Sequence, residues 1–126
     1  MLYRYVYHHP YPLDFPAMVA AAPLFEGTRD FRSLAGADDT KDPADAARPR
    51  TIFSSRLEVG DELVRYQVRG SAFLRHMVRN IVGTLLEVGK GNLAPVKIRN
   101  ILETADRRQA GPTAPARGLF LVRVDY

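Results

Sequence analysis

Alternating hydrophobic and polar positions predict β-structure in the first half of the chain. The run Tyr3-Arg4-Tyr5-Val6-Tyr7 alternates and is rich in aromatic residues, which is typical of a strand. Residues 51–59 and 62–69 predict a hairpin that turns at Gly60-Asp61. In its second strand one face carries Val64, Tyr66 and Val68, and the other carries Arg65, Gln67 and Arg69. We therefore expect the hairpin to bury one face and to leave the other polar and basic.

Hydrophobic residues at helical spacing predict three helices. A short helix follows a cap at Asp14, has Pro16 in its first turn, and carries apolar side chains at Phe15, Met18, Val19 and Ala22. The strongest pattern spans residues 72–89, with a stripe of Leu74, Val78, Ile81, Leu85 and Val88 that ends at Gly89-Lys90-Gly91-Asn92. A third helix opens at Pro95 and carries Ile98, Ile101, Leu102 and Ala105 on one face.

A last strand is expected from Leu119 to Val124, with Phe120, Val122 and Val124 on one face. Residues 35–49 contain no large apolar side chain, and we expect them to form a mobile surface loop. The order of elements predicts one α+β domain over residues 1–126, an antiparallel (mixed) sheet with helices packed on one face.

Composition narrows the function classes. The 126 residues include no cysteine, which excludes disulfides and thiol nucleophiles. No apolar run approaches the roughly 20 residues of a membrane span, so we expect a cytoplasmic protein without a membrane partner. Residues 64–108 hold 9 Lys and Arg against 3 Asp and Glu, whereas residues 1–63 hold 7 against 10. This asymmetry suggests a polyanionic partner, and an ordinary solvated basic surface is the alternative that it leaves open.

Two arginines in the longest predicted helix are anomalous. On a helical projection Arg75 falls inside the apolar arc and Arg79 falls on its edge. A guanidinium stays charged, so each head either reaches water along its aliphatic stem or meets an anion at the edge of a cleft. The pattern alone leaves both interpretations open.

Other candidate groups are less specific. Tyr3, Tyr5 and Tyr7 share one strand face, where they either stack on nucleobases or pack in the core. His8, His9 and His76 lack the spacing of metal ligands, so we expect no metal site.

Four stretches together resemble one family. Residues 70–89, GSAFLRHMVRNIVGTLLEVG, closely resemble the third motif of the bacterial tRNA pseudouridine synthase A family. Tyr3-Arg4-Tyr5 resembles its second motif, residues 106–108 with 110–115 resemble its conserved loop, and residues 118–122 resemble its closing strand. The resemblance runs in order from Tyr3 to Tyr126.

This resemblance implies the C-terminal domain of an enzyme that converts uridine to pseudouridine in the anticodon arm of tRNA. It implies half of a pseudouridine synthase fold, no cofactor, no metal, and a homodimer in the full-length enzyme. Tyr3 matches the tyrosine that stacks on the target base, Leu119 an apolar residue against the base, and Arg79 the arginine that pairs with the nucleophilic aspartate. Arg65, Arg69 and Arg75 are weaker candidates for tRNA binding.

The family's nucleophile lies in a Gly-Arg-Thr-Asp motif of the N-terminal half. The nearest string here is Gly27-Thr28-Arg29-Asp30, which has the wrong order and follows the tyrosine motif, so we reject Asp30. We therefore expect this chain to lack the catalytic aspartate and to be inactive alone. The alternative is a stand-alone RNA-binding or dimerisation domain without catalysis.

Overall fold

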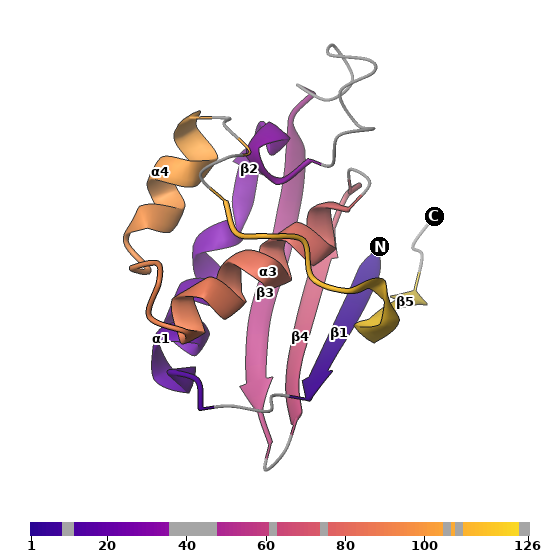
Figure 1. The fold of residues 1–126 in the computed structure, drawn as a ribbon. Coiled ribbons are helices and arrows are strands. Elements are labelled where there is room, and N and C mark those ends of the chain that lie inside the picture. Colours follow the sequence, from indigo (N-terminus) through magenta and orange to yellow (C-terminus); the bar gives the residue numbers. More distant parts are fainter. Residues whose placement is uncertain are drawn as a thin grey trace.

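The computed structural model describes residues 1–8, 12–35, 48–60, 63–73, 76–104, 107 and 110–123. Their strands form one antiparallel sheet in the order β2-β3-β4-β1-β5 (Figure 1). The strands are β1 (Leu2–His8), β2 (Gly27–Arg29), β3 (Arg50–Val59), β4 (Leu63–Gly70) and β5 (Leu119–Arg123). The helices α1 (Phe15–Ala21), α3 (Met77–Gly89) and α4 (Lys97–Thr104) lie on one face of the sheet. Short 3-10 helices occupy Ala22–Phe25, Arg32–Leu34 and Ala116–Gly118. The predicted α+β class is confirmed.

The sheet register places β1 between β4 and β5. Tyr5 is opposite Tyr66 on one side and opposite Leu119 on the other. The predicted hairpin is confirmed, with Val59 paired to Val64. The two faces of β4 are also as expected, since Val64, Tyr66 and Val68 are buried and Arg65 and Arg69 are exposed. The exposed face, which none of the described helices covers, is called the open face below.

The core lies between the sheet and the helices. Its largest fully buried side chains are Tyr66, Phe25, Phe31, Met18, Leu34, Ile52, Met77, Ile81, Leu85, Ile98, Ile101 and Val68. Tyr66 keeps its hydroxyl satisfied there, because it lies 2.6 Å from the Ser55 hydroxyl, which donates to the Ala22 carbonyl at 2.6 Å. Burial raises the pKa of the Tyr66 phenol well above its ordinary value. The core therefore tolerates this tyrosine only in its neutral form.

Helix α1 begins as predicted, with the Asp14 carboxylate accepting from the backbone nitrogen of Ala17 at 3.1 Å. Val19, expected on its apolar face, is instead 43% exposed. Helix α4 starts at Lys97, two residues after the predicted Pro95, and buries Ile98, Ile101 and Leu102 as expected. Such boundary shifts leave the packing faces of these helices largely unchanged.

The predicted start of the longest helix at residue 72 is wrong. Helix α3 starts at Met77, because the preceding His76 has left-handed backbone angles (φ 65°, ψ −2°) that a continuing helix does not allow. Phe73 lies before the helix and packs its ring against Tyr3. The helix end near Gly89 is confirmed. Leu74 and Arg75, assigned to this helix from the sequence, lie outside the described residues.

Helix α3 is covered on two sides, whereas the sequence predicted a single apolar stripe. The segment of residues 110–115 crosses the side of α3 that faces away from the sheet (Figure 1). As a result, every residue of α3 except Arg79 and Glu87 is buried. The expected mobile loop falls mainly on residues 36–47, outside the described part of the chain, as do Ala105 and Val124. No helix in the described part is both long and apolar enough to cross a bilayer.

Candidate active site

A cavity of about 210 Å³ opens where β1, the start of α3 and the start of β5 meet. Its lining residues are Tyr3, Phe73, His76, Met77, Val78, Arg79 and Leu119. Three of them, Tyr3, Arg79 and Leu119, are the candidates that the sequence placed in separate motifs. Their backbones come together because β1 pairs with β5, opposing Tyr3 to Leu121 and Tyr5 to Leu119, and because α3 packs over β1.

Tyr3 and Phe73 form the aromatic wall of the cavity. Their ring centroids are 5.3 Å apart at an interplanar angle of 90°, an edge-to-face pair. Such a pair fixes the orientation of the Tyr3 ring while the ring still contributes to the cavity surface. Phe73, which forms this pair, is not helical and precedes α3, so the late start of that helix is part of how the site is built.

Arg79 supplies the positive charge of the cavity. Its Nε donates to the carbonyl of Ala114 at 2.7 Å, and its own backbone carbonyl accepts from the nitrogen of Ala114 at 3.1 Å. In the described part of the chain the ion pairs join Arg32 to Asp30, Arg65 to Glu58 and Lys90 to Glu87, so Arg79 has no carboxylate partner there. The two terminal nitrogens of its guanidinium therefore remain available to an anion.

Residues 110–115, which hold Arg79 through Ala114, are themselves fixed by three residues on one face of α3. Asn80 accepts from the Thr113 hydroxyl at 2.5 Å, and Thr84 accepts from the nitrogen of Gly111 at 3.0 Å. Gly83 lies between them, where a Cβ would overlap the Pro112 carbonyl oxygen. Only glycine lets the backbone of residues 110–115 approach the helix this closely.

The buried amide of Asn80 links this arrangement to the rest of the fold. Its nitrogen donates to the Leu34 carbonyl at 2.6 Å, and its oxygen also accepts from Arg107 at 3.1 Å. Burial lowers the pKa of Arg107 from its ordinary value. The amide is thus satisfied by three separate segments, and it has little freedom to move.

Tyr5 supports the same segment from the sheet. Its hydroxyl donates to the Pro115 carbonyl at 2.6 Å. Burial raises the pKa of Tyr5, and the positive charges of Arg79 and Arg117 partly oppose that shift. Of the strand tyrosines, Tyr5 therefore belongs to packing and support, whereas Tyr3 lines the cavity.

The weaker RNA-binding candidates do not lie at the cavity. Arg65 and Arg69 lie on the open face, opposite to the face that carries Tyr3, because Tyr3 pairs with Val68 on the buried side of β4. Arg75 lies outside the described residues. One group of residues thus meets at the cavity, and a second, basic group lies across the sheet from it.

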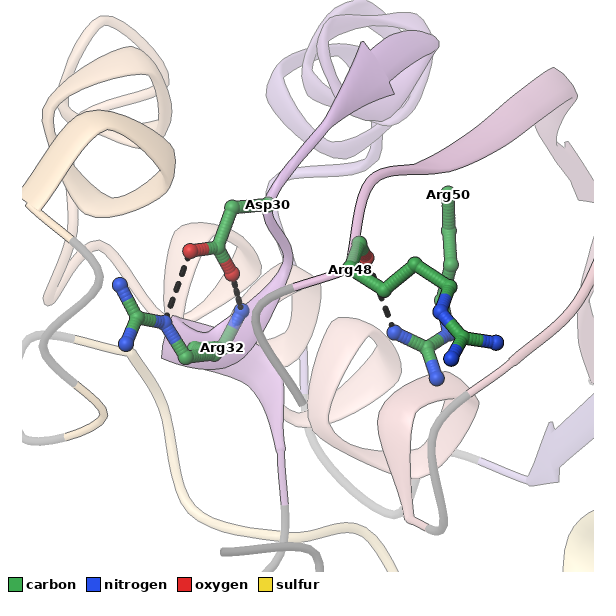
Figure 2. A network of polar contacts seen from close by, with 4 residues as sticks. All are labelled: Asp30, Arg32, Arg48 and Arg50. Carbon is green, nitrogen blue, oxygen red and sulfur yellow. Dashed lines mark hydrogen bonds and ion pairs between the residues drawn. The ribbon is translucent and has the colours of Figure 1, made fainter. Parts of the chain in front are cut away.

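The rejection of Asp30 as a nucleophile agrees with its position. It follows β2, at the edge of the sheet opposite to β5 and the cavity. Figure 2 shows its carboxylate held by the neighbouring Arg32, through the backbone nitrogen at 2.9 Å and through Nε at 2.7 Å. In the same view Arg50 donates to the backbone carbonyl of Arg48 at 3.0 Å. These contacts lie at the β2 edge of the sheet, away from the cavity.

The described residues include no group of three His, Asp or Glu side chains that could hold a metal ion. Asn80, Gly83 and Thr84 were not expected to form the site, although a polar pair four residues apart around a glycine in an apolar helix was a usable signal. His76 was considered only as a metal ligand, and no sequence pattern indicates a left-handed histidine.

Comparison with known proteins identifies the family of this chain. A family model described as tRNA pseudouridine synthase matches residues 21–126. Similar curated proteins include the tRNA pseudouridine synthases A of Solibacter usitatus, 52% identical over 97% of this chain and 48% of the relative, and of a Geobacillus species, 45% identical over 99% and 49%. That of a Thermotoga species is 44% identical over 98% of this chain and 49% of the relative. The chain spans about half the length of the curated relatives it matches. It belongs to the tRNA pseudouridine synthase family.

Proposed function

We propose that residues 1–126 are the C-terminal domain of a tRNA pseudouridine synthase that isomerises uridine to pseudouridine in the anticodon arm of tRNA. In this proposal the nucleophilic aspartate belongs to the N-terminal half, and the chain alone is inactive. The complete enzyme works in the cytoplasm as a homodimer and needs no cofactor. The observation that carries the proposal is the meeting of Tyr3, Arg79 and Leu119 at one cavity.

The size of the cavity supports a site that this chain shares with the N-terminal half of the enzyme. At about 210 Å³ it is smaller than the roughly 300–1,000 Å³ of complete ligand sites. A flipped nucleotide would therefore be enclosed only when a second wall is added. In our proposal the N-terminal half supplies that wall together with the aspartate, while Tyr3 stacks on the uracil and Leu119 packs against it.

Arg79 is suited to hold a carboxylate in place. Because its Nε is bound to Ala114, the guanidinium is already oriented, and its two terminal nitrogens can donate to both oxygens of an incoming carboxylate. Such a pair keeps the carboxylate ionised by lowering its pKa. An ionised and oriented carboxylate is what nucleophilic attack requires.

The proposed reaction is an isomerisation, so the same atoms are present at its start and end. The aspartate attacks the flipped nucleotide and the bond between N1 of uracil and the sugar breaks. The base then turns and C5 bonds to the sugar carbon, while the bond to the aspartate breaks and its carboxylate is regenerated. C5 loses its proton, and N1 gains one. Stacking against Tyr3 confines the base while it is detached, which keeps the second step effectively unimolecular.

We further propose that the open face binds tRNA phosphates at a distance from the target nucleotide. Arg65 and Arg69 protrude from β4, and Arg69 lies over the ring of Phe53 at 5.0 Å. The ion pair of Arg65 with Glu58, at 3.7 Å and with both side chains about half exposed, costs little to exchange for a phosphate. These arginines give affinity without sequence selectivity.

The decisive experiment joins this chain behind the N-terminal half of the Solibacter usitatus relative, which gives the two-half enzyme. Both it and the chain alone are incubated with unmodified tRNA, and pseudouridine is mapped. We expect product in the anticodon arm from the two-half enzyme only. Arg79→Met should lower turnover at least about 100-fold, since a site that stabilises charge loses one of its donors. Binding of tRNA should change little.

Arg99→Met is the matched control, because Arg99 is an exposed arginine on α4 and lies away from the cavity. Turnover by Arg79→Met equal to that of this control would remove Arg79 from the site. Product from the chain alone would contradict the missing aspartate. A stand-alone RNA-binding domain would bind tRNA but gain no activity in the two-half enzyme.

A further inference from the structure

The hydroxyl group of Tyr5 is a feature that core packing does not require. Tyr5 is 2% exposed and lies on the buried side of β1, where a phenylalanine would fill nearly the same volume and suit a strand equally well. Its hydroxyl donates to the Pro115 carbonyl at 2.6 Å. Pro115 is itself exposed, so water could satisfy that carbonyl in the absence of a tyrosine. The bond therefore serves more than the packing of the core.

This hydrogen bond acts one residue away from the contact that orients Arg79. Ala114 accepts from Nε of Arg79 through its carbonyl and donates to the backbone carbonyl of Arg79 through its nitrogen. The carbonyl of the next residue, Pro115, is the one that Tyr5 binds. Burial raises the pKa of Tyr5, and the charge of Arg79 is the largest effect that opposes this shift, which agrees with a short distance between the two side chains.

Proline at position 115 couples the two carbonyls. The peptide bond between Ala114 and Pro115 is planar, and the pyrrolidine ring fixes φ of Pro115, which is −59°. Only ψ of Pro115, which is 143°, can then turn its carbonyl relative to the plane that contains the Ala114 carbonyl oxygen. A hydrogen bond that holds the Pro115 carbonyl therefore also restrains the Ala114 carbonyl.

The ring of Tyr5 is held as well as its hydroxyl. The 3-10 helix Ala116–Gly118 lies beside β1 (Figure 1). A Cβ at Gly118 would lie 2.9 Å from two carbon atoms of the Tyr5 ring, so the backbone of Gly118 packs against that ring. In the sheet Tyr5 lies opposite Leu119, which lines the cavity, but Tyr5 is not among the described residues that line it. Tyr5 can thus act on the cavity through its neighbours without touching a bound base.

We propose that Tyr5 is a positioning residue for the reaction, whose hydroxyl fixes the direction of the Arg79 guanidinium through Pro115 and Ala114. This inference rests on the proposed function and adds a group outside the cavity on which turnover depends. Without the hydroxyl, Ala114 keeps its backbone bond to Arg79, but its carbonyl is free to turn with that of Pro115. The guanidinium follows the carbonyl and spends less time in the direction that meets the carboxylate.

The first test measures the restraint on Arg79 in this chain, without any chemistry. In Tyr5→Phe, which keeps the ring, hydrogen exchange of the Arg79 Nε proton followed by NMR should become about fivefold faster, because the acceptor of that proton is less restrained. Tyr66→Phe is the matched control, since Tyr66 lies opposite Tyr5 in the sheet, is also buried, and has its hydroxyl bonded to Ser55. It should leave that exchange rate unchanged. Equal exchange rates in the two variants would overturn the proposal.

The second test uses the two-half enzyme and separates positioning from general support of the fold. Tyr5→Phe should lower kcat about tenfold and leave KM within about twofold, whereas Tyr66→Phe should change neither. In the Arg79→Met background, Tyr5→Phe should change kcat by less than about twofold, because the group that it positions is absent. Equal losses of kcat in both backgrounds would mark Tyr5 as structural and overturn the proposal. No product from the parent two-half enzyme would instead count against the proposed function, and the exchange measurement would still decide the role of Tyr5.

Discussion

Gly83→Ala should detach the segment that holds Arg79 while strengthening the helix that carries the substitution. Alanine favours a helix over glycine by about 1 kcal/mol. The new Cβ, however, would overlap the Pro112 carbonyl oxygen and lie 2.8 Å from the Pro112 carbonyl carbon, both of them backbone atoms. Neither atom can rotate away, so the segment must move as a whole.

The magnitude follows from the hydrogen bonds that this movement breaks. They join Gly111 to Thr84, Thr113 to Asn80, and Ala114 to Arg79 in both directions. At about 1 kcal/mol each, their loss costs roughly 4 kcal/mol, of which helix propensity returns about 1. We therefore expect Gly83→Ala to lower the free energy of unfolding by about 3 kcal/mol, or the melting temperature by about 10 °C.

The assay is urea and thermal unfolding of this chain followed by circular dichroism, with Gly89→Ala as the matched control. Gly89 lies in the same helix and is also buried, but its Cβ would meet mainly the flexible end of the Met18 side chain. Methionine adjusts to such a contact, so the control should stay within about 1 kcal/mol of the parent. Equal unfolding midpoints for the two variants would refute the argument that close backbone approach requires Gly83.

Three further outcomes are expected. Arg79→Met in this chain should lower the free energy of unfolding by only about 1 kcal/mol in urea titrations, since the principal loss is one hydrogen bond to Ala114; a loss above about 3 kcal/mol would mark Arg79 as a structural residue. Because burial raises the pKa values of Tyr5 and Tyr66 above 10.0, the unfolded state ionises first, so the stability that these phenols contribute should be complete below about pH 10 and lost above it. A melting temperature that does not fall between about pH 10 and pH 11 would contradict this. The double variant Arg65→Gln, Arg69→Gln should flatten the salt dependence of tRNA binding by about 0.7–0.9 for each phosphate that the protein no longer neutralises, and an unchanged slope would exclude the open face.

Sequence patterns predicted most of the packing faces and every described strand except β2. The alternation in residues 63–69 determines which side of β4 is buried, because side chains of a strand point to opposite faces. The start of α3 was not predictable in this way. Residues 72–76 continue the helical spacing, whereas in the structure Phe73 packs on Tyr3 outside the helix and His76 has a left-handed backbone.

The candidate site could be predicted from the sequence only in part. The position of Arg79 on the edge of the apolar arc left open whether its head reaches water or meets an anion at a cleft. The resemblance selected Tyr3, Arg79 and Leu119, which line one cavity. The support of the site was accessible only on the helix side, where Asn80 and Thr84 flank Gly83, because the segment that they bind makes a long-range contact. Residues 110–115 have no periodicity, and nothing in them indicates that they cross α3 beside Gly83.

These contacts give α3 three separate tasks. One side packs on the sheet, a second side binds residues 110–115 through Asn80, Gly83 and Thr84, and its N-terminal turn contributes His76 and Arg79 to the cavity. The binding of residues 110–115 also controls the cavity, since both the side chain and the backbone of Arg79 bind Ala114. Residues that line no part of the cavity therefore set the direction of its cationic group. One helix therefore provides packing, attachment of residues 110–115 and the cationic group of the cavity, each through a different side.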